Sequence, residues 1–386
     1  MSTIKVNSVK NISTDDGGIS IDTSGHVTVD GVALPSAGPL SNRNLIINGA
    51  MQVAQRGTQL TGVTSGSNYT CDRFPLNISS LGTWTVDQST DAPNGFNNSL
   101  KLTCTTAVPS PASGNNTQIL YKVEARDLQR LSYGNANAQA AVLSFWVKSN
   151  KTGDGTVEFI QEDNSNRLLS QEYTINSADS WEYKTISIPA DTSGLFNNDN
   201  GTGLGIGFWL NTGSVFTSGS LNTVWGSYAA GNRNPSNLGV GGATSDYFAI
   251  TGVQLEVGSV ATPFEHRSYG DELARCQRYF RRFCEGATYA PAPSVGFGTG
   301  STNAYHTIVL SPEMRQVPTI ADWSNLRNDD LTGGAAVTAL AVSTAQSTSE
   351  AVQLSASSSS GLTQYRPYAL LANNTSSAKL DLSAEL

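Results

Sequence analysis

Two segments near the middle of the chain alternate between apolar and other residues with a period of two. In residues 141–148 one face carries Leu143, Phe145 and Val147. In residues 203–210 the even-numbered positions are apolar, and the other face has glycine at 203, 205 and 207, followed by Trp209. This period is that of a β-strand with one face in a core. Because glycine weakens a strand, we interpret the glycine positions as a shallow groove beside an aromatic platform.

Strand-like segments continue across residues 41–268, separated by clusters of Gly, Asn, Ser and Pro. The sequence predicts one all-β domain here, a β-sandwich or jelly roll, with a short helical turn at residues 125–131. The predicted strands cover residues 44–51, 83–87, 99–104, 117–123, 141–148, 157–161, 181–188, 204–210 and 247–257.

Residues 1–40 lack the pattern of a large core. Two short strands within residues 19–29 would place four apolar side chains on one face, those of Ile19, Ile21, Val27 and Val29. Two such strands are marginal in water by themselves. We therefore expect this arm either to be disordered or, as the alternation favours, to pair with other chains. Residues 34–39, which contain Pro and Gly, are predicted to be a linker.

A helical pattern covers residues 269–285. Ser268 is a suitable N-cap, with Asp271 as a weaker capping-box partner than Glu, and Gly286 is a suitable stop. The apolar residues fall on one helical face, formed by Leu273, Cys276, Phe280 and Phe283. The arginines lie largely off this face, and we expect them to pair with carboxylates between domains or protomers: Arg275, Arg278, Arg281 and Arg282.

Strand-like alternation returns after this helix and predicts a second, smaller β-sandwich over residues 286–386. The chain is thus divided into an arm (1–40), a jelly roll (41–268), a connecting helix (269–285) and a C-terminal β-sandwich. The strands predicted in the last domain cover residues 304–310, 336–342, 351–356, 365–372 and 379–386.

Composition narrows the choice of function. The 386 residues carry a net charge of −8 and only 14% charged residues, so the broad basic surface of a nucleic-acid-binding protein is absent. No apolar run is long enough to span a membrane, and no apolar signal region begins the chain. The four cysteines form no CxxC pair, and we expect them to be reduced and mostly buried. No cofactor is expected.

Three passages together resemble tail-fibre and related receptor-recognition proteins of bacteriophages, particularly marine and cyanobacterial phages. They are residues 43–57 with 69–74, residues 248–265, and residues 267–280, and the start Met1-Ser-Thr-Ile-Lys-Val-Asn7 resembles the virion-attachment ends of these proteins. The resemblance implies a carbohydrate-binding-module-like jelly roll. It also implies a virion component, often a homotrimer, that contacts the host surface.

Aromatic residues are the candidate ligand-binding groups. If the strands of Trp146 and Trp209 are neighbours in one sheet, their outward side chains would form a platform for sugar rings; otherwise loops or a neighbouring protomer would cover them. Trp225, Tyr228 and Arg233 lie in the loop-rich segment 212–245. They would form either a receptor-contacting loop or a flap packed on its own aromatic residues.

The sequence gives little support for a metal site or for a catalytic site. Asp246 precedes the last predicted jelly-roll strand, where related sugar-binding modules often hold calcium, but it is a single candidate and an ordinary turn Asp is the simpler reading. Glycoside hydrolysis requires two facing carboxylates. No spacing singles out a pair among Glu124, Asp127, Glu158, Glu162 and Asp163. We therefore expect no enzyme.

The function expected from the sequence is that of a phage tail fibre that adheres to a host-surface glycan without catalysis. The protein is expected to be a homotrimer in the virion, assembled in the host cytoplasm, with residues 1–40 attaching it to other tail or virion proteins. Two alternatives stay open, a purely architectural head or tail decoration protein and a polysaccharide depolymerase. The receptor and the neighbouring virion protein are left undefined.

Overall fold

The computed structural model describes residues 8–10, 18–163 and 166–386, and it divides the chain into two compact units, Met1–Ser268 and Tyr269–Leu386. Strands account for 45% of the chain and helices for 7%, which confirms the predicted all-β class. Each unit is described by itself below. Among the described residues, no helix is both long enough and apolar enough to cross a membrane.

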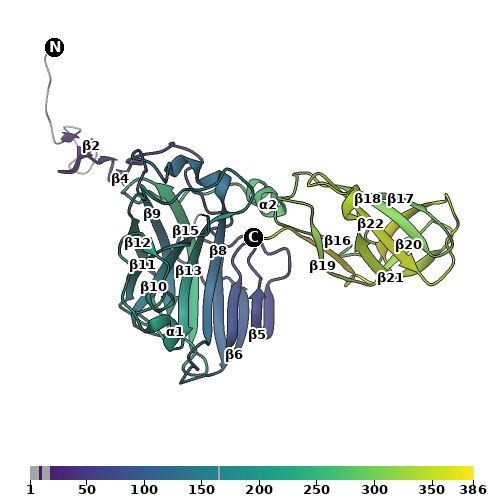
Figure 1. Ribbon diagram of the computed structural model, residues 1–386, viewed down its shortest axis with the longest axis horizontal. Coiled ribbons are helices and arrows are strands. Elements are labelled where there is room, and N and C mark those ends of the chain that lie inside the picture. Colours follow the sequence, from purple (N-terminus) through teal and green to yellow (C-terminus); the bar gives the residue numbers. More distant parts are fainter. Residues whose placement is uncertain (1–7, 11–17, 164–165) are drawn as a thin grey trace, which may run out of the picture. The chain divides into compact units, whose positions relative to one another are not determined.

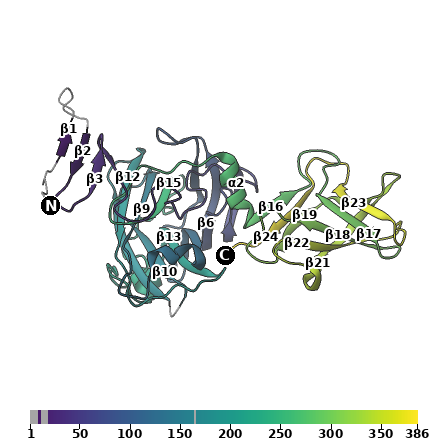
Figure 2. The same ribbon diagram turned by 90° about the horizontal axis from the view of Figure 1, so that it is seen from above.

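The first described strands form a small four-stranded sheet, whose members lie side by side in Figure 2. The register places Ile19 opposite Val29 and Ile21 opposite Val27, as the alternation predicts. These side chains remain substantially exposed to solvent. The pairing of this arm with other chains therefore stays a prediction. The strands are β1 (Ser8–Lys10), β2 (Gly18–Ile21), β3 (Val27–Val29) and β4 (Val32–Ala33).

The strands in the main body of the first unit are hydrogen-bonded into one 11-stranded sheet (Figure 1). It folds into two packed layers, which we call the two sheets of the sandwich, with Phe145 and Phe208 in contact between them. Its strand order is β12-β9-β15-β7-β6-β8-β13-β10-β11-β14, with β5 paired to β6. The long strand β6 joins the sheets, since its first part pairs with β8 and its last part with β7. The strands are β5 (Gln59–Asn68), β6 (Leu76–Ser89), β7 (Ser99–Thr106), β8 (Asn116–Glu124), β9 (Ala141–Ser149), β10 (Gly153–Gln161), β11 (Arg167–Ile175), β12 (Glu182–Ile188), β13 (Thr202–Thr212), β14 (Gly226–Ser227) and β15 (Tyr247–Val257).

The core lies between the two sheets and follows the predicted alternation. Phe145 of β9 and Phe208 of β13 meet edge to face, with ring centroids 5.1 Å apart. Both side chains are fully buried, together with Leu143, Val147, Ile206 and Leu210. The predicted helical turn is also confirmed, as the 3-10 helix η1 (Ala125–Leu131).

One predicted strand of this unit is wrong. Residues 44–51 form no strand, although Ile46 and Met51 are fully buried. The backbone there twists into the left-handed region at Asn48 and Met51. The Asn48 amide donates to the carbonyls of Val53 and Asp72, which replaces a strand ladder. Strands β5, β11 and the two-residue β14 have no counterpart among the predicted strands.

The second unit contains a three-stranded sheet and a closed six-stranded barrel. Its predicted all-β character is confirmed, with the barrel strands closing on each other. The elements are α2 (Tyr269–Gln277), β16 (Phe280–Phe283), β17 (Ser294–Gly298), β18 (Asn303–Val309), β19 (Thr319–Ser324), β20 (Leu326–Asp329), β21 (Gly334–Val342), η3 (Thr344–Gln346), β22 (Ala351–Ser358), β23 (Pro367–Ala372) and β24 (Lys379–Ser383). The sheet has the order β16-β24-β19.

The predicted helix to residue 285 is too long. Helix α2 ends at Gln277, and residues 280–283 form a strand that pairs with β24. The Arg282 guanidinium explains this choice, because it forms two hydrogen bonds to the Asp381 carboxylate across the pair, at 2.7 and 2.8 Å. Arg278 likewise lies 3.5 Å from Glu313. Arg278 and Arg282 thus each pair with a carboxylate of the second unit, and the predicted pairing between domains or protomers stays a prediction.

Candidate functional site

The outward side of strands β8, β13 and β10 carries the glycine positions singled out by the sequence. The register places Leu120 and Glu158 on either side of Gly207, and Lys122 and Ile160 on either side of Gly205. At the next position along β13, Trp209 lies opposite Gln118. We call this surface the glycine face: Gln118, Leu120, Lys122, Glu158, Ile160, Gly203, Gly205, Gly207 and Trp209.

The glycines at alternate positions of β13 have a structural cause. A Cβ at Gly207 would lie 2.6 Å from Gln118 Oε1 and 2.7 Å from Glu158 Oε1, so both polar side chains lean across the strand. A Cβ at Gly203 would meet the backbone of Ala125 at 2.7 Å. Glycine is therefore needed to bring polar side chains from two strands close together over a third.

A buried ion pair occupies the centre of this face. Arg233 donates to both carboxylate oxygens of Glu158, at 2.6 and 2.7 Å, and Glu158 is almost completely buried. Burial raises the pKa of the Glu158 carboxyl, and the Arg233 guanidinium acts in the opposite direction. Because both oxygens are engaged, Glu158 is a fixed acceptor that orients Arg233.

The Arg233 guanidinium also organises the aromatic residues around it. It lies 4.9 Å from the ring centroid of Trp209, 5.3 Å from that of Phe216 and 5.7 Å from that of Tyr228. Its Nη1 donates to the Tyr228 hydroxyl at 3.4 Å. Trp209 is fully buried beneath this cover, whereas Tyr228 remains 42% exposed. The segment around α1 (Ser214–Thr217) and η2 (Ala230–Asn232) thus packs on its own aromatic residues.

Polar groups also border the exposed end of the glycine face. Lys122 and Glu162 form an ion pair at 3.6 Å, and both are partly exposed. A Cβ at Gly205 would lie 3.1 Å from Glu162 Oε1. One further acceptor is buried, since Gln118 Oε1 has no hydrogen-bond partner among the described residues. The exposed end of the face therefore offers a cation and a carboxylate, whereas the Gln118 amide oxygen opposite Trp209 is buried.

The predicted Trp146 platform does not form with Trp209. Strand β9 pairs with β12 and β15, whereas β13 pairs with β8 and β10, so the two tryptophans lie in different sheets. Trp146 is partly buried and lies 5.4 Å from the exposed Tyr183 ring. The predicted platform required the strands of Trp146 and Trp209 to be neighbours, and they are not.

Trp225 also differs from the receptor-contacting role considered for it. It is buried, its Nε1 donates to the Pro189 carbonyl at 2.9 Å, and its ring meets Tyr133 edge to face. Of the five candidate residues, the structure brings Trp209, Tyr228 and Arg233 together. Sequence reasoning missed Gln118 and Lys122, although both alternate on a strand that pairs with the glycine strand.

One carboxylate oxygen of Asp246 is engaged by several protein groups. Its Oδ2 accepts the backbone N–H groups of Gly241 and Ala243, at 3.1 and 2.9 Å, and lies 3.5 Å from Lys151 Nζ. These donors compete with a cation for Oδ2, and calcium needs six to eight oxygen ligands. No group of three or more metal-binding side chains is found in the described part of the chain. The four cysteines are buried and outside disulfides, as predicted.

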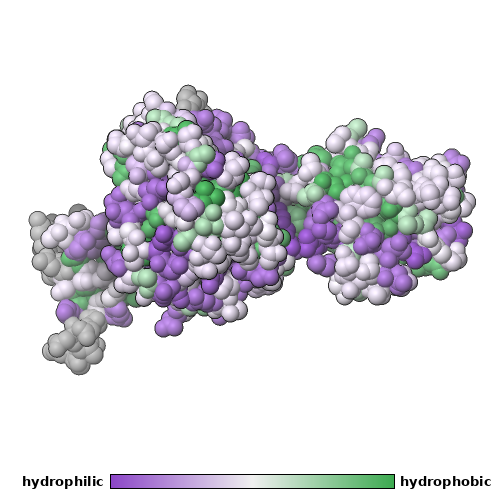
Figure 3. All heavy atoms as spheres, turned by 90° about the horizontal axis from the view of Figure 1, so that it is seen from below, coloured by the Kyte–Doolittle hydropathy of each residue, from purple (hydrophilic) through white to green (hydrophobic). Residues whose placement is uncertain are grey.

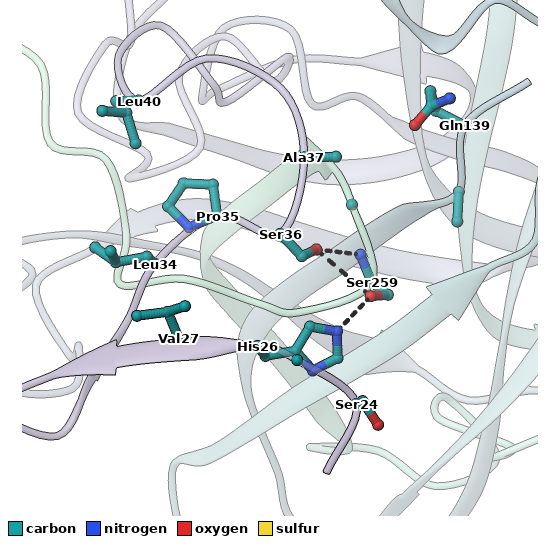
Figure 4. Close-up of a pocket in the computed structure, with 13 residues that line it drawn as sticks. Ser24, His26, Val27, Leu34, Pro35, Ser36, Ala37, Leu40, Gln139 and Ser259 are labelled. Atoms are coloured by element: carbon teal, nitrogen blue, oxygen red, sulfur yellow. Dashed lines mark hydrogen bonds between the residues drawn. The ribbon is translucent and has the colours of Figure 1, made fainter. Parts of the chain in front are cut away.

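A second hollow, of about 490 Å³, lies beside the β2–β3 turn (Figure 4). On one side His26 Nε2 lies 3.1 Å from the Ser259 hydroxyl, and Ser36 Oγ accepts the Ser259 N–H at 2.9 Å. On the other side the labelled side chains are apolar, namely Val27, Leu34, Pro35 and Leu40. These contacts hold the linker to the sandwich.

Comparisons with known proteins identify no family. No family model and no curated protein matches the chain. Three solved structures illustrate the weak likenesses. The enzymatically active domain of tailspike protein 4 from bacteriophage CBA120 is 12% identical with a TM-score of 0.29, over 55% of this chain and 21% of that one.

The other two are carbohydrate-binding modules. The family 11 module of a cellulosomal cellulase from Clostridium thermocellum is 11% identical with a TM-score of 0.26, over 58% of this chain and 97% of that one. The xylan-binding CBM22-2 domain from Paenibacillus barcinonensis is 14% identical with a TM-score of 0.26, over 55% and 99%. Likenesses this weak leave the function to be argued from the site.

Proposed function

We propose that the protein is a non-catalytic tail-fibre-type component of a phage virion that adheres to a glycan on the host surface. The glycan would bind at the glycine face, over the exposed Tyr228 ring beside Arg233, with the Lys122–Glu162 pair on the same face. In the virion the chain would be a homotrimer attached to other tail proteins through residues 1–40. The resemblance of three sequence passages to phage receptor-recognition proteins supports this context.

The single observation that carries the proposal is the exposed Tyr228 ring next to a guanidinium that cannot move freely. Sugar rings present C–H faces that pack on aromatic rings, and their hydroxyls are both donors and acceptors. Arg233 is held by Glu158 at 2.6 and 2.7 Å, so its direction is fixed before a ligand arrives. A fixed polar group beside an aromatic ring lowers the ordering cost of binding.

The experiment compares two tyrosines of the same unit with nearly equal exposure. Tyr228 is 42% exposed at the glycine face, and Tyr183 is 44% exposed beside Trp146 in the other sheet. Binding of the full chain to purified host envelope polysaccharide is measured by calorimetry for the wild type, Tyr228→Ala and Tyr183→Ala. We expect Tyr228→Ala to weaken binding about tenfold, which corresponds to ~1.4 kcal/mol, and Tyr183→Ala to leave it unchanged.

Other outcomes would redirect the proposal. Loss of binding in Tyr183→Ala alone would place the glycan at the Trp146 surface. No binding by the wild type would favour the architectural alternative. Release of new reducing ends during the incubation would favour a depolymerase and contradict the non-catalytic assignment.

A further inference from the structure

The outer side of two neighbouring barrel strands exposes a group of apolar side chains in the second unit. Phe297 of β17 lies directly opposite Tyr305 of β18 and Pro367 of β23. Val295 and Val309 are 70% and 71% exposed, and Phe297 is 55% exposed. We call this surface the barrel face: Val295, Phe297, Tyr305, Val309 and Pro367. Figure 3 shows hydrophobic residues gathered on part of the second unit and scattered over the first, where single exposed ones are ordinary.

The barrel face has no charge of its own. Strands β17, β18, β22 and β23 contain no Asp, Glu, Lys or Arg, in a chain whose net charge is −8. The neighbouring positions on β18 and β22 are uncharged and polar, such as Thr307, Gln353 and Ser355, and Arg366, which precedes Pro367, is paired with Asp330 at 2.8 Å. Aromatic enrichment with depletion of charge is typical of the centre of a protein interface. Such a surface offers nothing to a nucleic acid, an acidic peptide or an anionic membrane.

The closed barrel restricts how a partner can approach. Because β17 pairs with both β18 and β23, neither side of this strand is a free edge for an added strand. A partner must therefore meet the side chains of the face. The branched, highly exposed Val295 and Val309 suit a partner with an apolar surface better than a hydroxyl-rich sugar.

We propose that the barrel face is a contact between copies of this chain. Two identical chains of charge −8 repel each other over most of their surfaces, and an uncharged apolar face is where they can approach at the lowest electrostatic cost. An identical face also has matching chemistry, apolar against apolar and hydroxyl against hydroxyl. The inference rests on the homotrimer of the proposed function and is independent of the glycan site, which lies in the first unit.

The test uses cysteine labelling of the full chain. The native thiols are buried, so an introduced surface thiol gives the main signal. Val309→Cys places it on the barrel face. Leu331→Cys is the control, because Leu331 is 92% exposed on the turn between β20 and β21. Maleimide labelling rates are measured at a high protein concentration and after dilution, with the mass determined by light scattering at each concentration.

We expect a multimeric mass at the high concentration and a Val309→Cys labelling rate about tenfold slower than after dilution, as it is when ~90% of the faces are occupied. Leu331→Cys should react at the same rate throughout. A monomer mass of 40.7 kDa at both concentrations would overturn the proposal. So would a multimer in which Val309→Cys stays fully reactive. Slow labelling only in the presence of a neutral polysaccharide would assign the face to a glycan instead.

Discussion

At the scale of single residues, Glu158 and Arg233 show how a buried charge can serve positioning. Desolvating two ions costs several kcal/mol, and their attraction offsets this cost only with good geometry. Here the geometry is bidentate, and the guanidinium also contacts three aromatic rings. The pair is weak evidence for stability. It is better explained as a device that fixes Arg233 beside the exposed Tyr228.

His306 provides a residue-scale test of the barrel interior. It is fully buried, its Nε2 lies 2.7 Å from Asn328 Oδ1, and the Asn328 amide donates to Ser358 Oγ at 3.0 Å. Since Asn328 Oδ1 accepts, Nε2 carries the proton. His306 Nδ1 is buried with no hydrogen-bond partner among the described residues, so the neutral ring avoids leaving a buried N–H unpaired. Burial lowers the pKa of His306 below its ordinary value. The folded barrel therefore binds this proton less readily than the unfolded chain.

The sign of the pH effect follows from this lowered pKa. The stability that depends on neutral His306 is complete above the unfolded pKa of about 6.5 and is lost as the pH falls toward the folded value, at up to ~1.4 kcal/mol per pH unit. Urea unfolding of the barrel should thus shift to lower midpoints between about pH 7 and pH 5. In His306→Gln the shift should shrink. An equal shift in this variant would show that other groups cause the pH dependence.

At the scale of elements, the strand β6 depends on one glycine where it passes from one sheet to the other. Pairing with β8 ends at Ser79 and pairing with β7 begins at Thr83. Between them Gly82 has φ of +76°, and an added Cβ would collide with the Thr106 carbonyl oxygen. Only glycine satisfies both conditions.

We expect Gly82→Ala to destabilise the first unit by about 2 kcal/mol or more, because it adds backbone strain to a contact with rigid main chain. Gly114→Ala is the matched control. Nothing lies within 4 Å of a Cβ at Gly114, so its free energy of unfolding should barely change. Denaturant unfolding of both variants measures the difference. Similar stability in the two would mean that β6 rearranges at little cost.

The same elements show what the sequence could and could not predict. The period-two pattern predicted the strands of Phe145 and Phe208 and their inner faces, because burial of one face fixes the alternation. Their assignment to different sheets depends on the crossover in β6, which no local pattern reveals. Residues 44–51 were misassigned because their apolar side chains enter the core on an irregular backbone. The glycine positions predicted a shallow groove beside an aromatic platform, but the Gln118 and Glu158 side chains lean into the space over Gly207 and Trp209 is fully buried.

The passages that carry the family resemblance also meet in space. Arg43 Nε donates to the Thr262 hydroxyl at 2.7 Å, and the Asn44 N–H donates to Glu265 at 3.0 Å. Arg267 donates to the Ile46 carbonyl at 2.9 Å. These residues come from all three passages. These contacts hold the irregular segment after the linker against the end of the sandwich. The residues that carry the resemblance therefore have a structural role and do not themselves indicate a ligand-binding site.

At the scale of the whole molecule, charge and the barrel face together predict an unusual salt response. The chain has a net charge of −8, and the barrel face contributes no ion pairs to the proposed contact. Added salt shortens the Debye length from about 10 Å at ~0.1 M to about 3 Å at ~1 M. It therefore screens the repulsion between copies without weakening an attraction. Self-association should tighten as salt rises, as measured by the dissociation constant in sedimentation equilibrium.

Phe297→Asp puts a like charge on each face, so this variant should associate most weakly at low salt and regain part of the loss at high salt. Association that weakens steadily with salt in the wild type would point to a charged interface elsewhere on the chain and would remove the barrel face from consideration.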